Sequence, residues 1–206
     1  MENKGLMGQL PAKLHKHQGK NIAAISYYFG SKEGLYLAVA QLIAKTIRDG
    51  FHDVFLAIDN FLNQPLSVQV TDDALDLLQK NSHLLYNHFQ LEKKNLSFSR
   101  ILAREQLNPT EAYTVIHEQA LGPIHSRLNR LIAIYIGADP NHLTTLIHTH
   151  AILGETLSFR IARETLLRQT GWKHINENEF KIINQVLIEH TNILLAGLRH
   201  RKQYEK

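Results

Sequence analysis

The sequence predicts an all-α protein, and three observations support this prediction. Apolar residues recur at helical spacing in nearly every segment, and no stretch alternates with a period of two for long enough to predict a strand. Only 11 Gly and 5 Pro occur among the 206 residues, which is too few for a loop-rich β protein. A hydrophobic content of 44% against 20% charged residues indicates a chain that folds around a core.

Helix-breaking residues divide the chain into eight expected helices. These breaks contain Gly, Pro or Asn, and they lie between segments with helical periodicity. The expected helices are Pro11–Gln18, Ile22–Phe29, Lys32–Phe61, Val68–Gln90, Leu96–Glu105, Pro109–Ile136, Pro140–Gln169 and Glu177–Arg199.

Start signals precede four of these helices. Ser31 is a suitable N-cap for the helix that follows it. Asn108–Pro109 and Asp139–Pro140 each place an N-cap residue before a proline at the first helical position. Asn176 and Glu179 have the spacing of a capping box. These signals agree with the periodicity and strengthen the all-α prediction.

Composition excludes several classes of protein. The absence of cysteine rules out a disulfide framework, a thiolate nucleophile and a Cys-based metal site. No apolar run approaches the roughly 18 residues of a membrane span, and the first residues lack the apolar core of a signal peptide. We therefore expect a cytoplasmic protein with no membrane partner. The net charge of +4 is compatible with nucleic-acid binding without being diagnostic of it.

Residues 21–36, NIAAISYYFGSKEGLY, have the pattern of a short helix, a glycine turn and the start of a longer helix. Ile22, Ile25 and Phe29 share one helical face, so we expect them in the core. Small and polar residues on the other faces suit a close approach to a DNA groove and hydrogen bonds to phosphates or base edges. The residues expected to contact DNA are Asn21, Ala23, Ala24, Ser26, Tyr27, Tyr28 and Lys32.

The same segment closely resembles the turn, recognition helix and following helix of TetR/AcrR transcriptional regulators. Residues 27–35 match the family pattern Y-[YH]-F-x-[SN]-K-[ED]-x-L, which is highly specific. Further along, Arg104–Tyr113, Gly122–His125 and His148–Trp172 resemble the CecR-like branch of that family. Together the similarity covers most of the chain, from Gly19 to about Arg199.

This resemblance implies a TetR-like architecture of two domains. Residues 1–45 are expected to form the helix-turn-helix DNA-binding domain, and residues 46–206 the effector-binding and dimerisation domain. A homodimer of this kind binds palindromic operator DNA and releases it when a small-molecule effector binds. The resemblance implies no cofactor and no catalytic residue.

The residues before Gly19 depart from the family pattern. Only 18 residues precede it, too few for the first helix that family members pack over the helix-turn-helix pair. His15 and Gln18 also replace small apolar residues, and burying their polar groups without partners would cost about 1–3 kcal/mol each. We therefore expect an incomplete first helix. A misassigned start, a degenerate regulator with weakened DNA binding, and a rebuilt basic arm all remain open as explanations.

Two C-terminal helices carry apolar stripes that predict the dimer interface. The stripes follow alternating three- and four-residue spacings on otherwise polar helices. The alternative is that one stripe packs only within its own subunit. The interface residues expected from spacing and resemblance are Leu143, Ile147, His150, Gly154, Leu157, Ile161, Phe180, Leu187, His190 and Leu194.

The middle helices are expected to enclose an effector pocket, because helix bundles bind ligands between facing helices. For each candidate, a place in the core or on the surface is an alternative, and for Arg104 an ion pair with Glu105 is a further alternative. The candidates are Tyr86, Phe89, Phe98, Arg104, Tyr113, His117 and Phe159. Arg160 and Arg163 would suit an anionic ligand or salt bridges between subunits.

The 13 histidines do not form a metal-binding pattern. His148 and His150 are two residues apart, so on a regular helix they point in nearly opposite directions and do not bind one metal ion. No metal site is therefore expected.

Three functions were weighed. The first is a ligand-responsive repressor, and the second is a non-DNA-binding remnant that dimerises and binds ligand. The third, a His-dependent hydrolase, is disfavoured because the sequence lacks a nucleophile elbow, a phosphate loop and paired carboxylates.

Overall fold

The computed structural model describes residues 27–65, 71–79 and 96–204. All of the regular secondary structure in these residues is helical, which confirms the predicted fold class. In chain order the elements are residues 27–29, α2 (Lys32–Gly50), α3 (His52–Leu62), residues 71–79, α5 (Leu96–Leu107), α6 (Glu111–Ile116), the π-helical turn η3 (His117–Leu121), α7 (Gly122–Ile136), α8 (Leu143–Ile161), α9 (Arg163–Thr170) and α10 (Glu177–Tyr204). Within the described residues, no helix is long and apolar enough to cross a membrane.

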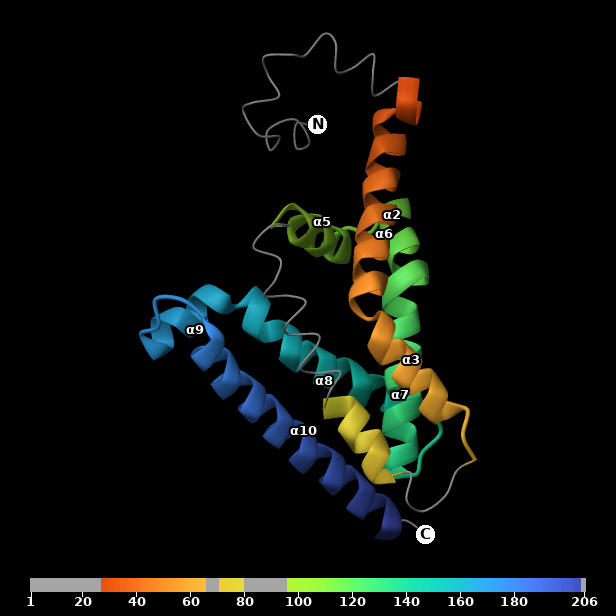
Figure 1. Ribbon diagram of the computed structural model, residues 1–206, viewed down its shortest axis with the longest axis vertical. Helices are drawn as coiled ribbons and strands as arrows, with labels where there is room; N and C mark the ends of the chain where they lie inside the picture. Colours follow the sequence, from red (N-terminus) through yellow and green to blue (C-terminus); the bar gives the residue numbers. More distant parts are fainter. Residues whose placement is uncertain (1–26, 66–70, 80–95, 205–206) are drawn as a thin grey trace.

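The helices form two groups that meet at α7. The first group consists of α2, α3, α6, η3 and α7, with α2 running alongside α6 and η3 (Figure 1). The second consists of α8 and α10, which lie beside one another and are joined at one end through α9 (Figure 1). Residue 27 lies at the free end of α2, far from the C-terminal end of α10. Three of the residues predicted to contact DNA, Tyr27, Tyr28 and Lys32, therefore lie at the tip of the first group.

Three of the expected long helices are interrupted. The helix expected over Lys32–Phe61 breaks at Phe51, whose backbone leaves the helical region with φ −105° and ψ 3°. The helix expected over Pro140–Gln169 begins at Leu143 and breaks at Ala162, with φ −97° and ψ 26°. The helix expected over Pro109–Ile136 contains the π-helical turn η3. Apolar periodicity continues through each interruption, so the sequence pattern alone did not reveal them.

The chemistry of Gly122 and Pro123 explains the π-helical turn. Pro123 has no N–H, so it cannot donate the helical hydrogen bond to the carbonyl of Gln119. The Gly122 N–H instead donates to the carbonyl of His117, five residues earlier. A Cβ on Gly122 would lie 3.1 Å from that His117 carbonyl oxygen, so glycine suits this close approach. The Gln119 carbonyl is left without its usual helical partner.

Two of the expected caps are present and two are displaced. The Gly34 N–H donates to the Ser31 hydroxyl at 3.0 Å, and the Asn176 N–H donates to the Glu179 carboxylate at 2.9 Å. The expected cap at Asn108–Pro109 is wrong, because Thr110 caps α6 by accepting from the Ala112 N–H. The expected cap at Asp139–Pro140 is wrong too. There the Asp139 carboxylate accepts from the Asn141 N–H inside the loop, and His142 is the N-cap of α8.

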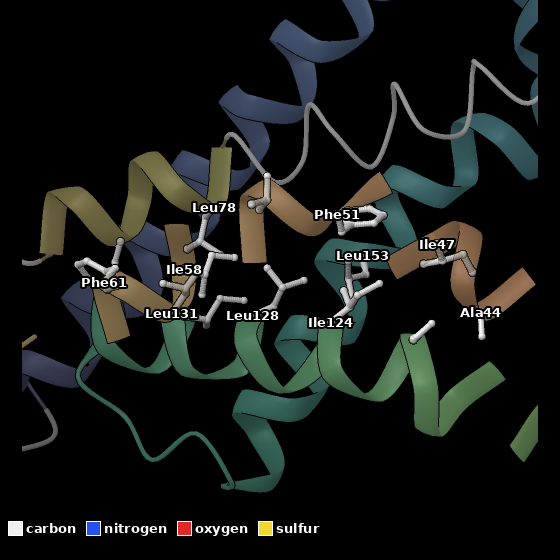
Figure 2. Close-up of a cluster of buried hydrophobic side chains, with 14 of the residues drawn as sticks. Ala44, Ile47, Phe51, Ile58, Phe61, Leu78, Ile124, Leu128, Leu131 and Leu153 are labelled. Atoms are coloured by element: carbon white, nitrogen blue, oxygen red, sulfur yellow. The ribbon is translucent and has the colours of Figure 1, made fainter. Parts of the chain in front are cut away.

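A main hydrophobic core holds the first group to α8 and α10. It is built from one apolar face of each helix, as the helical spacing predicts (Figure 2). Its labelled members are Ala44, Ile47, Phe51, Ile58, Phe61, Leu78, Ile124, Leu128, Leu131 and Leu153. A smaller cluster of Leu167, Ile175, Ile183 and Leu187 joins α9 to α10.

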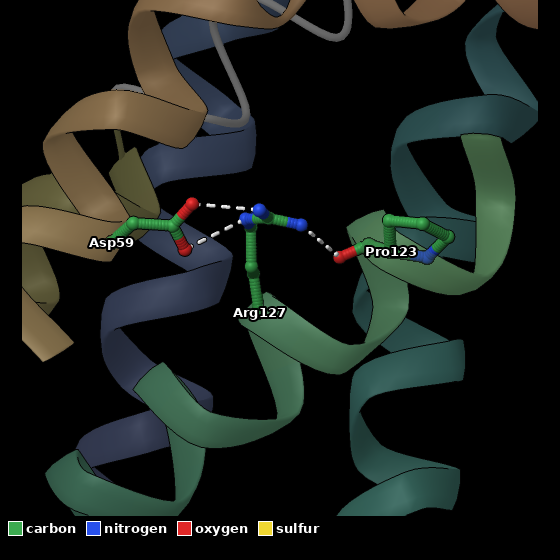
Figure 3. Close-up of polar contacts among 3 residues, drawn as sticks. All are labelled: Asp59, Pro123 and Arg127. Carbon is green, nitrogen blue, oxygen red and sulfur yellow. Dashed lines mark hydrogen bonds and ion pairs between the residues drawn. The ribbon is translucent and has the colours of Figure 1, made fainter. Parts of the chain in front are cut away.

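A polar clamp fixes α3 against α7. Figure 3 shows the guanidinium of Arg127 donating to both carboxylate oxygens of Asp59, at 2.9 and 2.7 Å. The same guanidinium donates to the carbonyl of Pro123 at 3.2 Å and lies 4.4 Å from the ring centroid of Phe55. A two-pronged ion pair of this kind restricts orientation more than a single contact does.

Candidate DNA-binding end and effector-binding region

The tip of α2 presents the exposed tyrosines that the sequence predicts. The side chains of Tyr27 and Tyr28 are 82% and 75% exposed, and their rings meet edge to face at 5.0 Å. Gly30 has φ +73°, a left-handed conformation that favours glycine, and it ends the short helix as expected. Lys32 is exposed at the first residue of α2. The other expected DNA contacts, Asn21, Ala23, Ala24 and Ser26, lie outside the described residues.

The first turn of α2 combines the N-terminus of a helix with the positive charge of Lys32. An arrangement of this kind suits a phosphate group. The backbone N–H of Glu33 and the Ser31 hydroxyl hold the pKa of the Glu33 carboxyl below its ordinary value. Phe29, expected in the core, is 42% exposed. Ile22 and Ile25, which share its expected face, lie outside the described residues.

A buried carboxylate joins α2 to the turn between α5 and α6. Glu105 is fully buried, and one of its oxygens accepts from the Tyr36 hydroxyl at 2.8 Å. Its other oxygen accepts from the Thr110 N–H at 2.9 Å and from the Thr110 hydroxyl at 2.8 Å. The contact spans 69 residues of sequence and lies one turn from the start of α2.

The pKa values follow from this geometry. Burial raises the pKa of Glu105, but hydrogen bonds from Thr110 and Tyr36, together with the nearby charge of Arg104, outweigh that effect and leave the pKa below its ordinary value. Burial, followed by the hydrogen bond to Glu105, raises the pKa of Tyr36 to about 12. The folded protein therefore favours an ionised Glu105 and a neutral Tyr36.

A second contact joins α2 to the π-helical turn. Nη1 of Arg48 donates to the free carbonyl of Gln119 and to the Gln119 side-chain oxygen, both at 3.2 Å. Arg48 therefore replaces the donor that Pro123 lacks. The helix α2 thus contacts the turn between α5 and α6 at Tyr36 and the π-helical turn at Arg48.

The structure does not gather the expected effector-pocket residues into one site. Phe98 packs against the main core, and Phe159 packs against the smaller cluster between α9 and α10. The Arg104 guanidinium lies 5.8 Å from the Tyr36 ring centroid. Tyr113 faces His117 with 5.9 Å between ring centroids. Tyr86 and Phe89 lie outside the described residues.

His117 alone among these candidates lines the cavity that the structure places beside α7. This cavity, of about 440 Å³, lies between η3, one face of α7 and the loop before α8. Its polar lining residues are His117, His125, Ser126, Asn129, Arg130 and Asn141. Sequence analysis missed His125, Ser126, Asn129 and Arg130. Their three- and four-residue spacing along one polar face of the helix is the signal that could have identified them.

The histidines near this cavity contact one another. The rings of His125 and His150 lie 6.3 Å apart, centroid to centroid. Burial lowers the pKa of His125, and the charges of His150 and His117 lower it further. Within the described part of the chain, no group of three or more metal-ligating side chains is positioned to hold a metal ion.

The expected stripe on α8 lies on the surface of the subunit. Leu143, Ile147 and Ile161 are 67%, 56% and 82% exposed, His150 and Gly154 are exposed, and Leu157 is half-buried. Leu146, which the sequence analysis did not include, is also exposed. This surface is available to a partner.

The expected stripe on α10 is divided between the subunit interior and the surface. Leu187 belongs to the smaller hydrophobic cluster and is 1% exposed, so it is not available to a partner, and Phe180 packs on the same cluster. His190 and Leu194 are exposed, as are Ile182 and Ile193, which sequence analysis missed. His190 contacts the Glu155 carboxylate of α8.

Comparisons with known proteins cover most of the chain. Residues 78–198 match the family model of the C-terminal domain of the HTH-type transcriptional dual regulator CecR. The chain is also 42% identical over 183 residues to the HTH-type transcriptional dual regulator CecR of Shigella flexneri. That alignment spans 89% of this chain and 81% of the relative.

Proposed function

Because this chain belongs to the CecR family of helix-turn-helix transcriptional regulators, we propose that it is a dimeric, ligand-responsive repressor that binds palindromic operator DNA. The family assignment confirms the resemblance expected from the sequence. No enzyme function is proposed, because the family consists of transcriptional regulators. Repression, dimerisation and release by an effector are the parts that the proposal adds.

The exposed tip of α2 is the observation that carries the DNA-binding part of the proposal. Tyr27 and Tyr28 are largely exposed although tyrosine has a large apolar ring, and Lys32 adds a charge at a helix N-terminus. Aromatic hydroxyls, an ammonium group and the N-terminus of a helix are typical contacts to a DNA backbone. Their grouping at one end of a long helix supports a DNA-binding end.

The apolar surface of α8 and α10 supports a homodimer. Exposed aliphatic side chains on both helices, among them Ile147, Ile161 and Ile193, would lose contact with water if two copies paired through this surface. Each buried aliphatic side chain of this size contributes about 1.5–3 kcal/mol. A two-fold interface would also give the two DNA-binding ends the symmetry of a palindromic operator.

Contacts between α2 and the distal helices support ligand response. Movement of the turn between α5 and α6, or of η3, would act on α2 through Glu105 and Arg48. Suppose that a ligand binds the protein more tightly when α2 is in one position than when it is in another. Such a ligand would change the affinity for the operator, typically by 1–3 kcal/mol. The relative from Shigella is named a dual regulator. A reporter driven by the operator therefore distinguishes repression from activation.

DNA binding is tested with fluorescence anisotropy, using duplexes from the region upstream of the gene at several salt concentrations. We expect binding that weakens as salt rises, because bound Lys and Arg displace counterions from phosphates. Lys32→Ala should weaken binding to all sequences and reduce the slope of log affinity against log salt by about one.

Lys181→Ala is the matched control, because Lys181 is an exposed lysine on α10 that pairs with Glu177. It should leave both the affinity and the salt slope unchanged. Equal effects of the two variants would contradict a DNA contact at Lys32. An intact dimer that binds none of the duplexes would favour the alternative function, a dimerising ligand-binding module that no longer contacts DNA.

A further inference from the structure

The cavity beside α7 is lined by hydrogen-bond donors and basic groups. His117 and His125 approach it from η3 and α7, and Arg130 approaches from the next turn of α7. The Ser126 hydroxyl and the Asn129 amide add further polar groups. Its volume of about 440 Å³ falls within the range of small-molecule sites.

No carboxylate among the described residues lines this cavity. Arg130 takes part in none of the ion pairs found in the described part of the chain. The acidic residue nearest in sequence to the Asn141 side of the cavity is Asp139, and its carboxylate accepts from the Asn141 N–H at 2.8 Å. Among the described residues, therefore, Arg130 has no carboxylate partner and no carboxylate lines the cavity.

We propose that this cavity binds a small organic or inorganic anion, one that carries a carboxylate, phosphate or sulfate group. The Arg130 guanidinium supplies the permanent charge and donates two parallel hydrogen bonds to the anion. His117 and His125 also line the cavity and would donate to the anion, and Ser126 and Asn129 would select for oxygen acceptors.

Binding of the anion should strengthen as the pH falls. The charged groups that face His125 are His117 on η3 and His150 on α8, and both lower its pKa after the larger effect of burial. An anion in the cavity would favour the protonated imidazole and offset this repulsion. Affinity should therefore rise as the pH falls from 8 to 6 and keep rising below pH 6, because burial lowers the pKa of His125 below the ordinary histidine range.

The cavity is connected to α2 through the contacts of the π-helical turn η3. His117 lines the cavity and accepts the π-type hydrogen bond from Gly122, while Gln119 of the same turn accepts from Arg48 of α2. This part of the inference rests on the proposed ligand-responsive function and names the chemical class of its effector. Anion binding itself can be measured on the protein without DNA, so the two ideas fail independently.

The test is a calorimetric titration of the full-length protein with sodium sulfate at pH 6 and pH 8, with sodium chloride at matched ionic strength as the blank. Sulfate keeps its charge between pH 6 and pH 8, so a change in its affinity reports protonation of histidines in the protein. We expect saturable binding that is several-fold tighter at pH 6. Arg130→Gln should weaken it at least tenfold.

Arg100→Gln is the matched control, because Arg100 is an exposed arginine on α5 that does not line the cavity. It should bind sulfate as the wild type does. A second variant, Ser126→Ala, removes one hydroxyl from the cavity wall and should weaken binding several-fold. The proposal is overturned if sulfate, phosphate and citrate all fail to bind above the chloride blank, or if Arg130→Gln binds them as tightly as the wild type.

Discussion

Glu105 shows how one residue connects distant parts of this chain. Its carboxylate is removed from solvent, yet it accepts three hydrogen bonds from Tyr36 and Thr110. Hydrogen bonds to a charged group contribute about 1.5–3 kcal/mol each, and an unsatisfied buried carboxylate would cost more. Satisfied in this way, Glu105 fixes the first turns of α2 against the turn that begins α6.

The sequence does not predict this contact. An ion pair between Arg104 and Glu105 was one expectation, but adjacent helical residues point about 100° apart. In the structure Glu105 faces the interior, whereas Arg104 is exposed and stacks near the Tyr36 ring. A partner 69 residues away is set by tertiary packing and leaves no local pattern.

The raised pKa of Tyr36 predicts a stability change at alkaline pH. The folded-state pKa is about 12 against an ordinary value of 10.0. The stabilisation by neutral Tyr36 is therefore fully present below pH 10 and is lost as the pH rises through 12. Tyr36 is partly exposed, so water screens the contact. We therefore expect the free energy of unfolding of the wild type to fall by about 1 kcal/mol more than that of Tyr36→Phe between pH 10 and pH 12.

Urea unfolding followed by circular dichroism at pH 7, 10 and 12 measures this difference. The variant removes the titrating hydroxyl, and the other tyrosines and lysines titrate in both proteins. Parallel pH profiles for the two proteins would show that Tyr36 ionises as freely in the folded chain as in the unfolded one.

At the scale of elements, helical periodicity predicted which segments are helical but not where the long helices break. Phe51 lies in the main core at the break between α2 and α3, so its apolar side chain preserves the sequence pattern while its backbone does not remain helical. The Gly122–Pro123 pair was a detectable signal for the π-helical turn. Because apolar residues continue at helical spacing on both sides of this pair, one continuous helix was expected over Pro109–Ile136.

The clamp between α3 and α7 predicts a measurable loss of stability. Arg127→Met keeps the aliphatic stem but removes both bonds to Asp59 and the contact of the guanidinium with the Phe55 ring. Partial exposure of the pair lowers its contribution, so we expect a decrease of about 1–2 kcal/mol in the free energy of unfolding. Chemical denaturation at pH 7 measures it.

Arg168→Met is the control for this variant. Arg168 pairs with Glu164 on one exposed face of α9, and the two side chains are 80% and 70% exposed. A surface pair of this kind contributes about 0.5 kcal/mol or less. A loss in Arg127→Met no larger than that in Arg168→Met would contradict the clamp.

At the scale of the whole molecule, the exposed tyrosines and the exposed aliphatic surface lie on different parts of one subunit. Tyr27 and Tyr28 lie just before α2, whereas exposed aliphatic residues such as Ile147 and Ile193 lie on α8 and α10. Figure 1 shows that α8 and α10 lie away from the end of α2 where these tyrosines are found. Most of the α8 residues expected in the dimer interface are exposed, and their pairing with a second subunit stays a prediction. On α10 the expected stripe included Leu187, which packs inside the subunit, but not the exposed Ile182 and Ile193, because helical spacing alone does not tell which face a neighbouring helix covers.

Mass measurement of the protein bound to its operator tests the proposed dimeric, DNA-binding function most directly. Light scattering after size-exclusion chromatography should give two protein chains per palindromic duplex, and a dimer without DNA. Ile147→Glu, which places a charge on the exposed face of α8, should yield monomers and bind DNA at least tenfold more weakly. A complex with one chain per duplex, or an Ile147→Glu variant that remains dimeric and binds as the wild type does, would contradict the account.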